Sequence, residues 1–151
     1  FATMNTFGNG DSTGLYRGSQ LLNHAQLDRW NMVSTLDYLP PQEEVAIVLA
    51  QVPAMASEPG QQQLRAMVAL AGLTRKGFAV GDLSLLMSLR TVITWAENFQ
   101  VFHDVGLAFH LTFLNKCEPA ERAVVAEYFQ RCFNEELKPV SAPDTDPHHA
   151  A

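Results

Sequence analysis

Apolar side chains recur with a helical period along most of this chain. Four of them stand at i, i+3, i+4 and i+7 and so share one face of a helix: Leu64, Met67, Val68 and Ala71. A second helix is predicted over residues 89–102, because its apolar stripe follows Ser88, a residue type that favours the N-cap position. The same pattern predicts further helices over residues 43–52 and 105–113 and from Pro119 to about Leu137.

Two stretches interrupt this helical pattern. "PAMASEPG" at residues 53–60 is predicted to be a linker, and "KGFAVGDL" at residues 76–83 is predicted to break the helix before it. Around these breaks, residues 42–137 are expected to form a compact helical domain.

The first 39 residues follow a different pattern. Residues 1–6 and 32–39 have the composition of strands, and a glycine-rich loop and a short polar helix within residues 19–30 are predicted between them. Pro40 and Pro41 end the second strand and can start a helix. At the other end of the chain, residues 139–151 contain three prolines and little apolar content, so a disordered tail is expected there.

Composition narrows the class of protein. Of the 151 residues 47% are hydrophobic and 17% are charged, which suits one or two small globular units. The longest apolar run, "VAIVLAQV" at residues 45–52, falls well short of the ~20 residues that a membrane span needs. A net charge of −6, without a block of Lys or Arg, argues against a nucleic-acid-binding surface. Cys117 and Cys132 are expected to be core thiols of a cytoplasmic protein.

The sequence offers no recognisable metal site or catalytic triad. His103 and His110 stand two helical turns apart, about 10.5 Å along the axis, which is too far to share one ion without a third element. The carboxylates of Glu43 and Glu44 point apart on a helix because the residues are adjacent. No metal ion is therefore expected.

The glycine-rich loop "GNGDSTGLYRG" at residues 8–18 raises the question of a phosphate cradle. A phosphate-binding P-loop requires a Lys at a fixed spacing, and this loop has none. A dinucleotide-binding loop would need glycine where Thr13 stands. The loop is therefore predicted to be a turn-rich connection.

Three polar residues have both a structural and a functional interpretation. Asn5 ends the first predicted strand, where an amide is often a turn former but where ligands also bind in open α/β sheets. Arg29, beside Asp28, can be a solvated charge at a helix end. Arg90 follows the predicted N-cap, a place where the helix dipole disfavours a cation. Residue chemistry alone leaves both interpretations open.

Four long stretches of the chain resemble a known family. They are "ATMNTFGNGDSTGLYRGSQLLNHAQLDRW", "TLDYLPPQEEVAIVLAQV", "GDLSLLMSLRTVITWAENF" and "LAFHLTFLNKCEPAERAVVAEYFQRCF". Together they are similar to the C-terminal part of the CobS-type ATPase subunit of aerobic cobaltochelatase, an AAA+ ATPase close to the MoxR proteins and the magnesium-chelatase ATPase subunit. The resemblance runs from Phe1 to Leu137.

This resemblance implies a fold that is mostly helical overall. Residues 1–39 would be the α/β remnant of an AAA+ P-loop core, with the sensor 1 strand, the arginine-finger helix and the strand that follows. Residues 40–138 would be the mainly α-helical lid, and residues 139–151 the disordered tail. The two strands would flank an empty slot that the strand of the nucleotide loop fills in the family.

The resemblance also implies roles for the three polar residues. Asn5, in "ATMNT", would face the γ-phosphate as sensor 1. Arg29, in "AQLDRW", would be the arginine finger that reaches a neighbouring subunit's nucleotide and neutralises charge on the transferred phosphoryl group. Arg90, in "SLRTVITWA", would bind phosphate as sensor 2, although Leu89 stands where family members commonly have Pro.

The complete protein implied by the resemblance hydrolyses ATP with Mg²⁺ in a homo-oligomeric ring, expected to be a hexamer. It would drive a large, CobN-like chelatase subunit, with a CobT-like subunit as further partner, to insert cobalt into a corrinoid ring during cobalamin biosynthesis. The 151 residues contain no Walker A or Walker B motif, so ATP and Mg²⁺ would be bound mainly elsewhere in the protein, and the chain alone is expected to be inactive.

Two other hypotheses stay open at this point. A MoxR-like or phage-borne AAA+ ATPase would keep the same engine but remodel another protein. A non-enzymatic helical interaction domain would leave the arginines merely solvated. A phosphate-binding loop in sequence upstream of Phe1 would count against the second of these.

Overall fold

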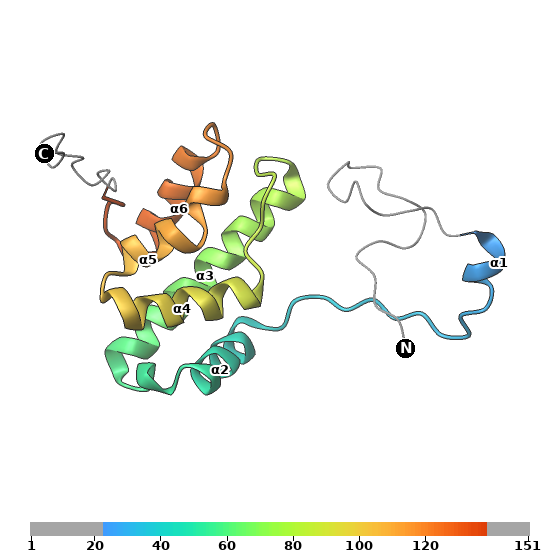
Figure 1. Ribbon diagram of the computed structural model, residues 1–151, viewed down its shortest axis with the longest axis horizontal. Helices are drawn as coiled ribbons and strands as arrows, with labels where there is room; N and C mark the ends of the chain where they lie inside the picture. Colours follow the sequence, from blue (N-terminus) through green and yellow to red (C-terminus); the bar gives the residue numbers. More distant parts are fainter. Residues whose placement is uncertain (1–22, 139–151) are drawn as a thin grey trace, which may run out of the picture. The chain divides into compact units, whose positions relative to one another are not determined.

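The computed structural model describes residues 23–138 of the chain (Figure 1). These residues belong to two separate units, which divide between Tyr38 and Leu39. The described residues contain helices and no strand. Asn5, the glycine-rich loop and the expected tail lie outside the described residues, so their predictions stand untested.

The smaller unit contributes one helical turn, α1 (His24–Leu27). Asn23 and Gln26 cap it reciprocally: the Ala25 amide donates to Asn23 Oδ1 at 2.9 Å, and the Asn23 amide donates to Gln26 Oε1 at 3.2 Å. This is the capping-box pattern, in which two side chains satisfy the amides at a helix start. The short helix expected within residues 19–30 is therefore present in the described part of that range, residues 23–30, but it is only one turn long.

The strand expected at residues 32–39 does not form. The backbone there has no regular secondary structure, and every one of these residues is exposed. A strand is stable only when its amides and carbonyls pair with a neighbouring strand. No such neighbour exists among residues 23–138, and this explains why strand-like composition produced no strand.

The larger unit is a helical domain, as the periodicity predicts. Its α-helices are joined by two short 3₁₀ helices, η1 and η2. In chain order the elements are α2 (Pro41–Gln51), η1 (Pro53–Met55), α3 (Glu58–Val80), α4 (Leu89–Phe102), α5 (Val105–Thr112), η2 (Leu114–Lys116) and α6 (Arg122–Phe133). Helix α3 contacts α2, α4 and α6, while α5 packs mainly on α4 (Figure 1).

Local chemistry fixes where several of these helices begin. Ser88 Oγ accepts a hydrogen bond from the Thr91 amide, so the predicted N-cap and the predicted bounds of α4 are both confirmed. Asp104 caps α5 in the same way through the Leu107 amide at 2.9 Å. Pro41 occupies the first turn of α2, where its missing amide hydrogen costs nothing.

Three predicted boundaries were wrong. Helix α3 starts at Glu58, inside the expected linker, because Ser57 caps it and Pro59 is tolerated in its first turn. It also runs through most of the expected interruption at residues 76–83 and ends only at Gly81, whose φ of 86° suits a left-handed C-cap. Helix α6 is shorter than expected, from Arg122 to Phe133.

An aromatic cluster forms one part of the domain core. It joins α4, α5 and α6 through Trp95, Phe109, Phe113, Phe129 and Phe133. The ring centroids of Trp95 and Phe109 lie 4.8 Å apart, and the Trp95 indole donates to the Val105 carbonyl at 3.0 Å. Tilted aromatic pairs with a satisfied indole N–H are favourable in a core. The cluster therefore fixes α4 against α5 and α6.

Candidate functional site

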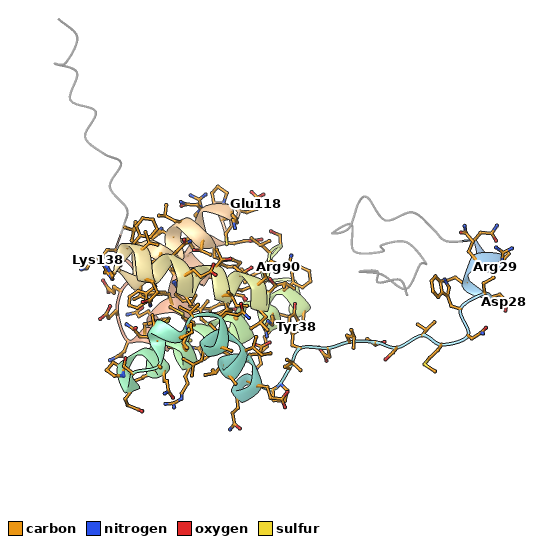
Figure 2. The ribbon with its side chains drawn as sticks, turned by 60° about the horizontal axis from the view of Figure 1, so that its bottom comes forward. Asp28, Arg29, Tyr38, Arg90, Glu118 and Lys138 are labelled. Atoms are coloured by element: carbon orange, nitrogen blue, oxygen red, sulfur yellow. The ribbon has the colours of Figure 1, made fainter. Side chains whose placement is uncertain are left out.

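Arg29 lies in the turn that follows α1. It is exposed, and its backbone amide donates to the Gln26 carbonyl at 3.3 Å. Asp28 and Arg29 both project from this turn (Figure 2). Its exposure leaves both interpretations of Arg29 open, a solvated charge or an arginine finger.

Arg90 is the second residue of α4, directly after Leu89 and the N-cap Ser88. It is exposed on the surface of the helical domain (Figure 2). Within residues 23–138 its guanidinium forms no ion pair. The positive end of the helix dipole and a guanidinium favour an anion at the same place, so the surface around Arg90 suits a phosphate. Arg29 and Arg90 belong to different units, each described by itself.

A buried polar network that the sequence analysis does not predict supports the segment that leads into α4. Glu44 of α2 and Arg75 of α3 form an ion pair in which Arg75 Nη1 lies 2.8 and 3.0 Å from the two carboxylate oxygens. Arg75 Nε donates to the Met87 carbonyl at 2.9 Å, and the Met87 amide donates to Thr74 Oγ1 at 3.0 Å. The network therefore joins α2, α3 and the residue before Ser88.

This network is deeply buried. Glu44 is 1% exposed and Thr74 is 0% exposed, while the Arg75 side chain is 12% exposed. Charges at such depth persist only when they are paired and hydrogen-bonded. A helical pattern that includes the charged positions would have found them, because Glu44 stands one turn before the buried Val48 and Arg75 one turn after the buried Ala71.

The loop between α3 and α4 has further anchors. Glu121 Oε1 accepts from the Ser84 amide at 2.8 Å, which ties the loop to the start of α6. Leu83 is buried, and its side chain would lie 3.1 Å from a Cβ added at Gly77. Gly77 thus lets the loop fold closely back on α3. The loop before Arg90 is held at both ends.

Both cysteines are free thiols; Cys117 is buried in the core, as expected, whereas Cys132 is half-buried and packs against it. Burial raises the pKa of Cys117 to about 11, and its thiol donates to the Phe113 carbonyl at 3.6 Å. Burial likewise raises the pKa of Cys132. Both thiols are therefore protonated near neutral pH, and neither has the thiolate character of a nucleophile.

The described part of the chain has one further feature that could bind a ligand, and Arg90 does not line it. A hollow of about 490 Å³ lies beside the turn between α4 and α5, and its rim carries Asp104, Glu135 and Glu136 together with Lys138. Nowhere in residues 23–138 do three His, Cys, Asp or Glu side chains gather as metal ligands would. His110 instead shares a hydrogen bond of 2.9 Å with the Lys138 carbonyl. None of the helices described here is long and apolar enough to cross a membrane.

Fold and surface together define a helical domain that presents a solvent-exposed arginine at the capped start of one helix, with a second exposed arginine in a separate unit. The chain is 55% identical over 142 residues to a protein of Sinorhizobium sp named aerobic cobaltochelatase subunit CobS. The similarity covers 94% of this chain, and the chain spans 43% of the length of that curated relative. This similarity confirms the resemblance to CobS that the sequence indicated. No family profile and no solved structure matches the chain.

Proposed function

We propose that this chain is part of an ATP-hydrolysing subunit of an aerobic cobaltochelatase, which serves cobalamin biosynthesis. The observation that carries the proposal is the 55% identity with CobS over nearly the whole chain. The geometry supports it in one respect: an exposed arginine stands at the start of α4, where an anion is the natural partner.

The helical domain takes the role of the AAA+ lid in this proposal. Arg90 would contact phosphate oxygens of a bound nucleotide, because a guanidinium presents several N–H donors in a rigid plane and keeps its charge at any physiological pH. Arg29 would reach the nucleotide of a neighbouring subunit in a ring, proposed to be a hexamer. Asn5 would orient the attacking water from the sensor 1 position.

The residues present fit a nucleotide only in part. The two exposed guanidiniums suit phosphate oxygens, whereas the sequence has no Lys-containing phosphate loop and no Walker B carboxylate. ATP and Mg²⁺ would supply the phosphoryl group and the charge neutralisation for hydrolysis. This chain's contribution is to position guanidinium groups, so the isolated chain should show no measurable ATP hydrolysis.

The partners follow from the same proposal. The complete subunit would act on a large, CobN-like chelatase subunit with a CobT-like subunit, and cobalt and the corrinoid would be substrates bound by the large subunit. The cytoplasm is the proposed location.

A hybrid protein tests the proposal. This chain replaces the matching 142-residue region of the Sinorhizobium CobS, and ATP hydrolysis, nucleotide binding and cobalt insertion are measured with that protein's own partner subunits. A hybrid that binds nucleotide, hydrolyses ATP and inserts cobalt supports the proposal. A hybrid that folds and hydrolyses ATP but inserts no cobalt favours an AAA+ ATPase that remodels another protein.

Single substitutions in the hybrid test the roles proposed for Arg29 and Arg90. Arg29→Ala should lower turnover about a thousandfold and leave nucleotide binding almost unchanged, because an arginine finger acts on the transition state. Arg90→Ala should weaken nucleotide binding. Arg131→Ala, at an exposed arginine of α6, is the matched control and should change neither. Full turnover in the Arg29→Ala hybrid would refute the finger assignment.

A further inference from the structure

Met87 is the residue directly before the N-cap of α4, and side chains from α3 hold both polar groups of its backbone. Its amide donates to Thr74 Oγ1 at 3.0 Å, and its carbonyl accepts from Arg75 Nε at 2.9 Å. We propose that Thr74, Arg75 and Glu44 are positioning residues for Arg90. They fix the peptide from which α4 starts and hence the place from which the Arg90 guanidinium projects.

Thr74 is fully used in this arrangement. Its hydroxyl donates to the Ala71 carbonyl at 2.8 Å, so its hydrogen is committed and a lone pair faces the Met87 amide. A hydroxyl with one donor and two acceptor sites can serve both bonds at once. Valine would keep the shape of the side chain and lose both bonds.

Glu44 fixes the orientation of Arg75. A guanidinium is planar, so binding of Nη1 by the Glu44 carboxylate determines the direction in which Nε–H points. That direction leads to the Met87 carbonyl. Contacts therefore run from α2 through α3 to Met87, the residue before the N-cap of α4, and Arg90 stands three residues beyond it.

The competing explanation is that this network only stabilises the core. Met87 is itself 0% exposed, so apolar packing of its side chain alone could hold the segment. The two explanations differ in what the loss of one hydroxyl does. A purely stabilising hydroxyl affects the whole domain alike, whereas a positioning hydroxyl affects the start of α4 more than the rest.

The domain contains a matched control. Thr112 of α5 is 3% exposed, and its Oγ1 accepts from Asn98 Nδ2 at 2.8 Å, which joins α5 to α4 away from Met87. Thr74→Val and Thr112→Val each delete one buried hydroxyl and preserve side-chain shape. Thr74→Ser retains the hydroxyl and should restore normal behaviour.

Hydrogen exchange in the 151-residue chain is the first measurement, and it does not depend on any activity. The amides of Thr91 and Val92 donate to Ser88 and report on the first turn of α4. In Thr74→Val they should exchange about tenfold faster than in Thr112→Val, the factor that loss of one buried hydrogen bond corresponds to. If Thr74→Val does not fold, Glu44→Gln is compared with Thr112→Val in its place. Equal exchange in the two variants overturns the proposal.

Nucleotide binding by the hybrid with CobS is the second measurement, and here the inference rests on the proposed function. Thr74→Val should weaken nucleotide binding severalfold, while Thr74→Ser and Thr112→Val should leave it unchanged. If Arg90→Ala weakens binding and Thr74→Val does not, the positioning role is refuted. If Arg90→Ala has no effect, the function proposed for Arg90 fails instead, and the exchange measurement alone decides the positioning role.

Discussion

Most large apolar side chains of residues 23–38 are exposed, whereas those of the helical domain are mostly buried. In the smaller unit Met32 is 87% exposed and Leu36 is 89% exposed, whereas Trp95 and Phe109 of the helical domain are 0% exposed. The difference lies in where the backbone amides and carbonyls of a helix and of a strand find their hydrogen-bond partners. A helix pairs its own amides and carbonyls and needs only a face to pack on, while a strand needs another strand beside it. The helical domain therefore forms its core from its own helices, and the strand-like segment is left uncovered.

The two tryptophans provide the largest contrast between the regions. Trp95→Ala should lower the free energy of unfolding by about 3–5 kcal/mol, because it leaves a cavity in the aromatic cluster and removes the bond to Val105. Trp30, which is 43% exposed, should cost no more than about 0.5 kcal/mol when replaced by alanine. Urea denaturation followed by circular dichroism measures both. A Trp30→Ala variant as unstable as Trp95→Ala would show that the smaller unit is packed in solution.

A buried and an exposed ion pair of α3 give a comparison within the helical domain. Glu44→Ala should cost about 3 kcal/mol, because it leaves the buried Arg75 charge without its carboxylate. Glu58→Ala should cost under about 1 kcal/mol, because the pair of Glu58 with Arg65 is 3.7 Å long and exposed. Thermal unfolding at low and high salt measures both. Similar losses in the two variants would mean that burial does not set the strength of the Glu44 pair.

Two glycines of α3 should respond in opposite directions. A Cβ at Gly60 would lie 2.6 Å from the Met55 backbone carbonyl oxygen, so Gly60→Ala should destabilise the domain by about 1–3 kcal/mol. A Cβ at Gly72 meets nothing within 4 Å, and Gly72→Ala should stabilise by about 0.5–1 kcal/mol through helix propensity. Urea midpoints of the two variants test this. Stabilisation by Gly60→Ala would contradict the close contact of η1 with α3.

Much of the helical domain was predictable because its signals are local. The bounds of α4 follow from Ser88 and the apolar stripe behind it. The interruption expected at residues 76–83 was wrong because two glycines with different functions look alike in sequence. Gly77 lies inside α3 and permits the approach of Leu83, while Gly81 ends the helix with a positive φ. Only the tertiary contact distinguishes them.

The candidate site was predictable to a smaller extent. Arg29 and Arg90 are site candidates through the resemblance alone, and the chemistry of their own neighbourhoods leaves a solvated role open. The network behind Arg90 was missed because Glu44 and Arg75 are 31 residues apart and meet only when α2 packs on α3. The strand expected at residues 32–39 failed for a related reason, since its stability depends on partners that its own residues cannot provide.

The smallest expected effect concerns two exposed arginines at opposite ends of helices. Arg90 lies in the first turn of α4 and Arg131 in the last turn of α6. Because the helix dipole disfavours a cation at the N-terminal end and favours one at the C-terminal end, Arg90→Gln should raise stability by about 0.3–1 kcal/mol and Arg131→Gln should lower it by a similar amount. Urea denaturation at low salt measures both, and the difference should shrink at high salt.

If Arg90→Gln stabilises the domain, the arginine at this position lowers the stability of the fold. Such a cost is expected of a residue whose role is to bind an anionic partner. If Arg90→Gln destabilises as much as Arg131→Gln, the side chain supports the fold, and the electrostatic argument for a phosphate at this end of α4 is lost.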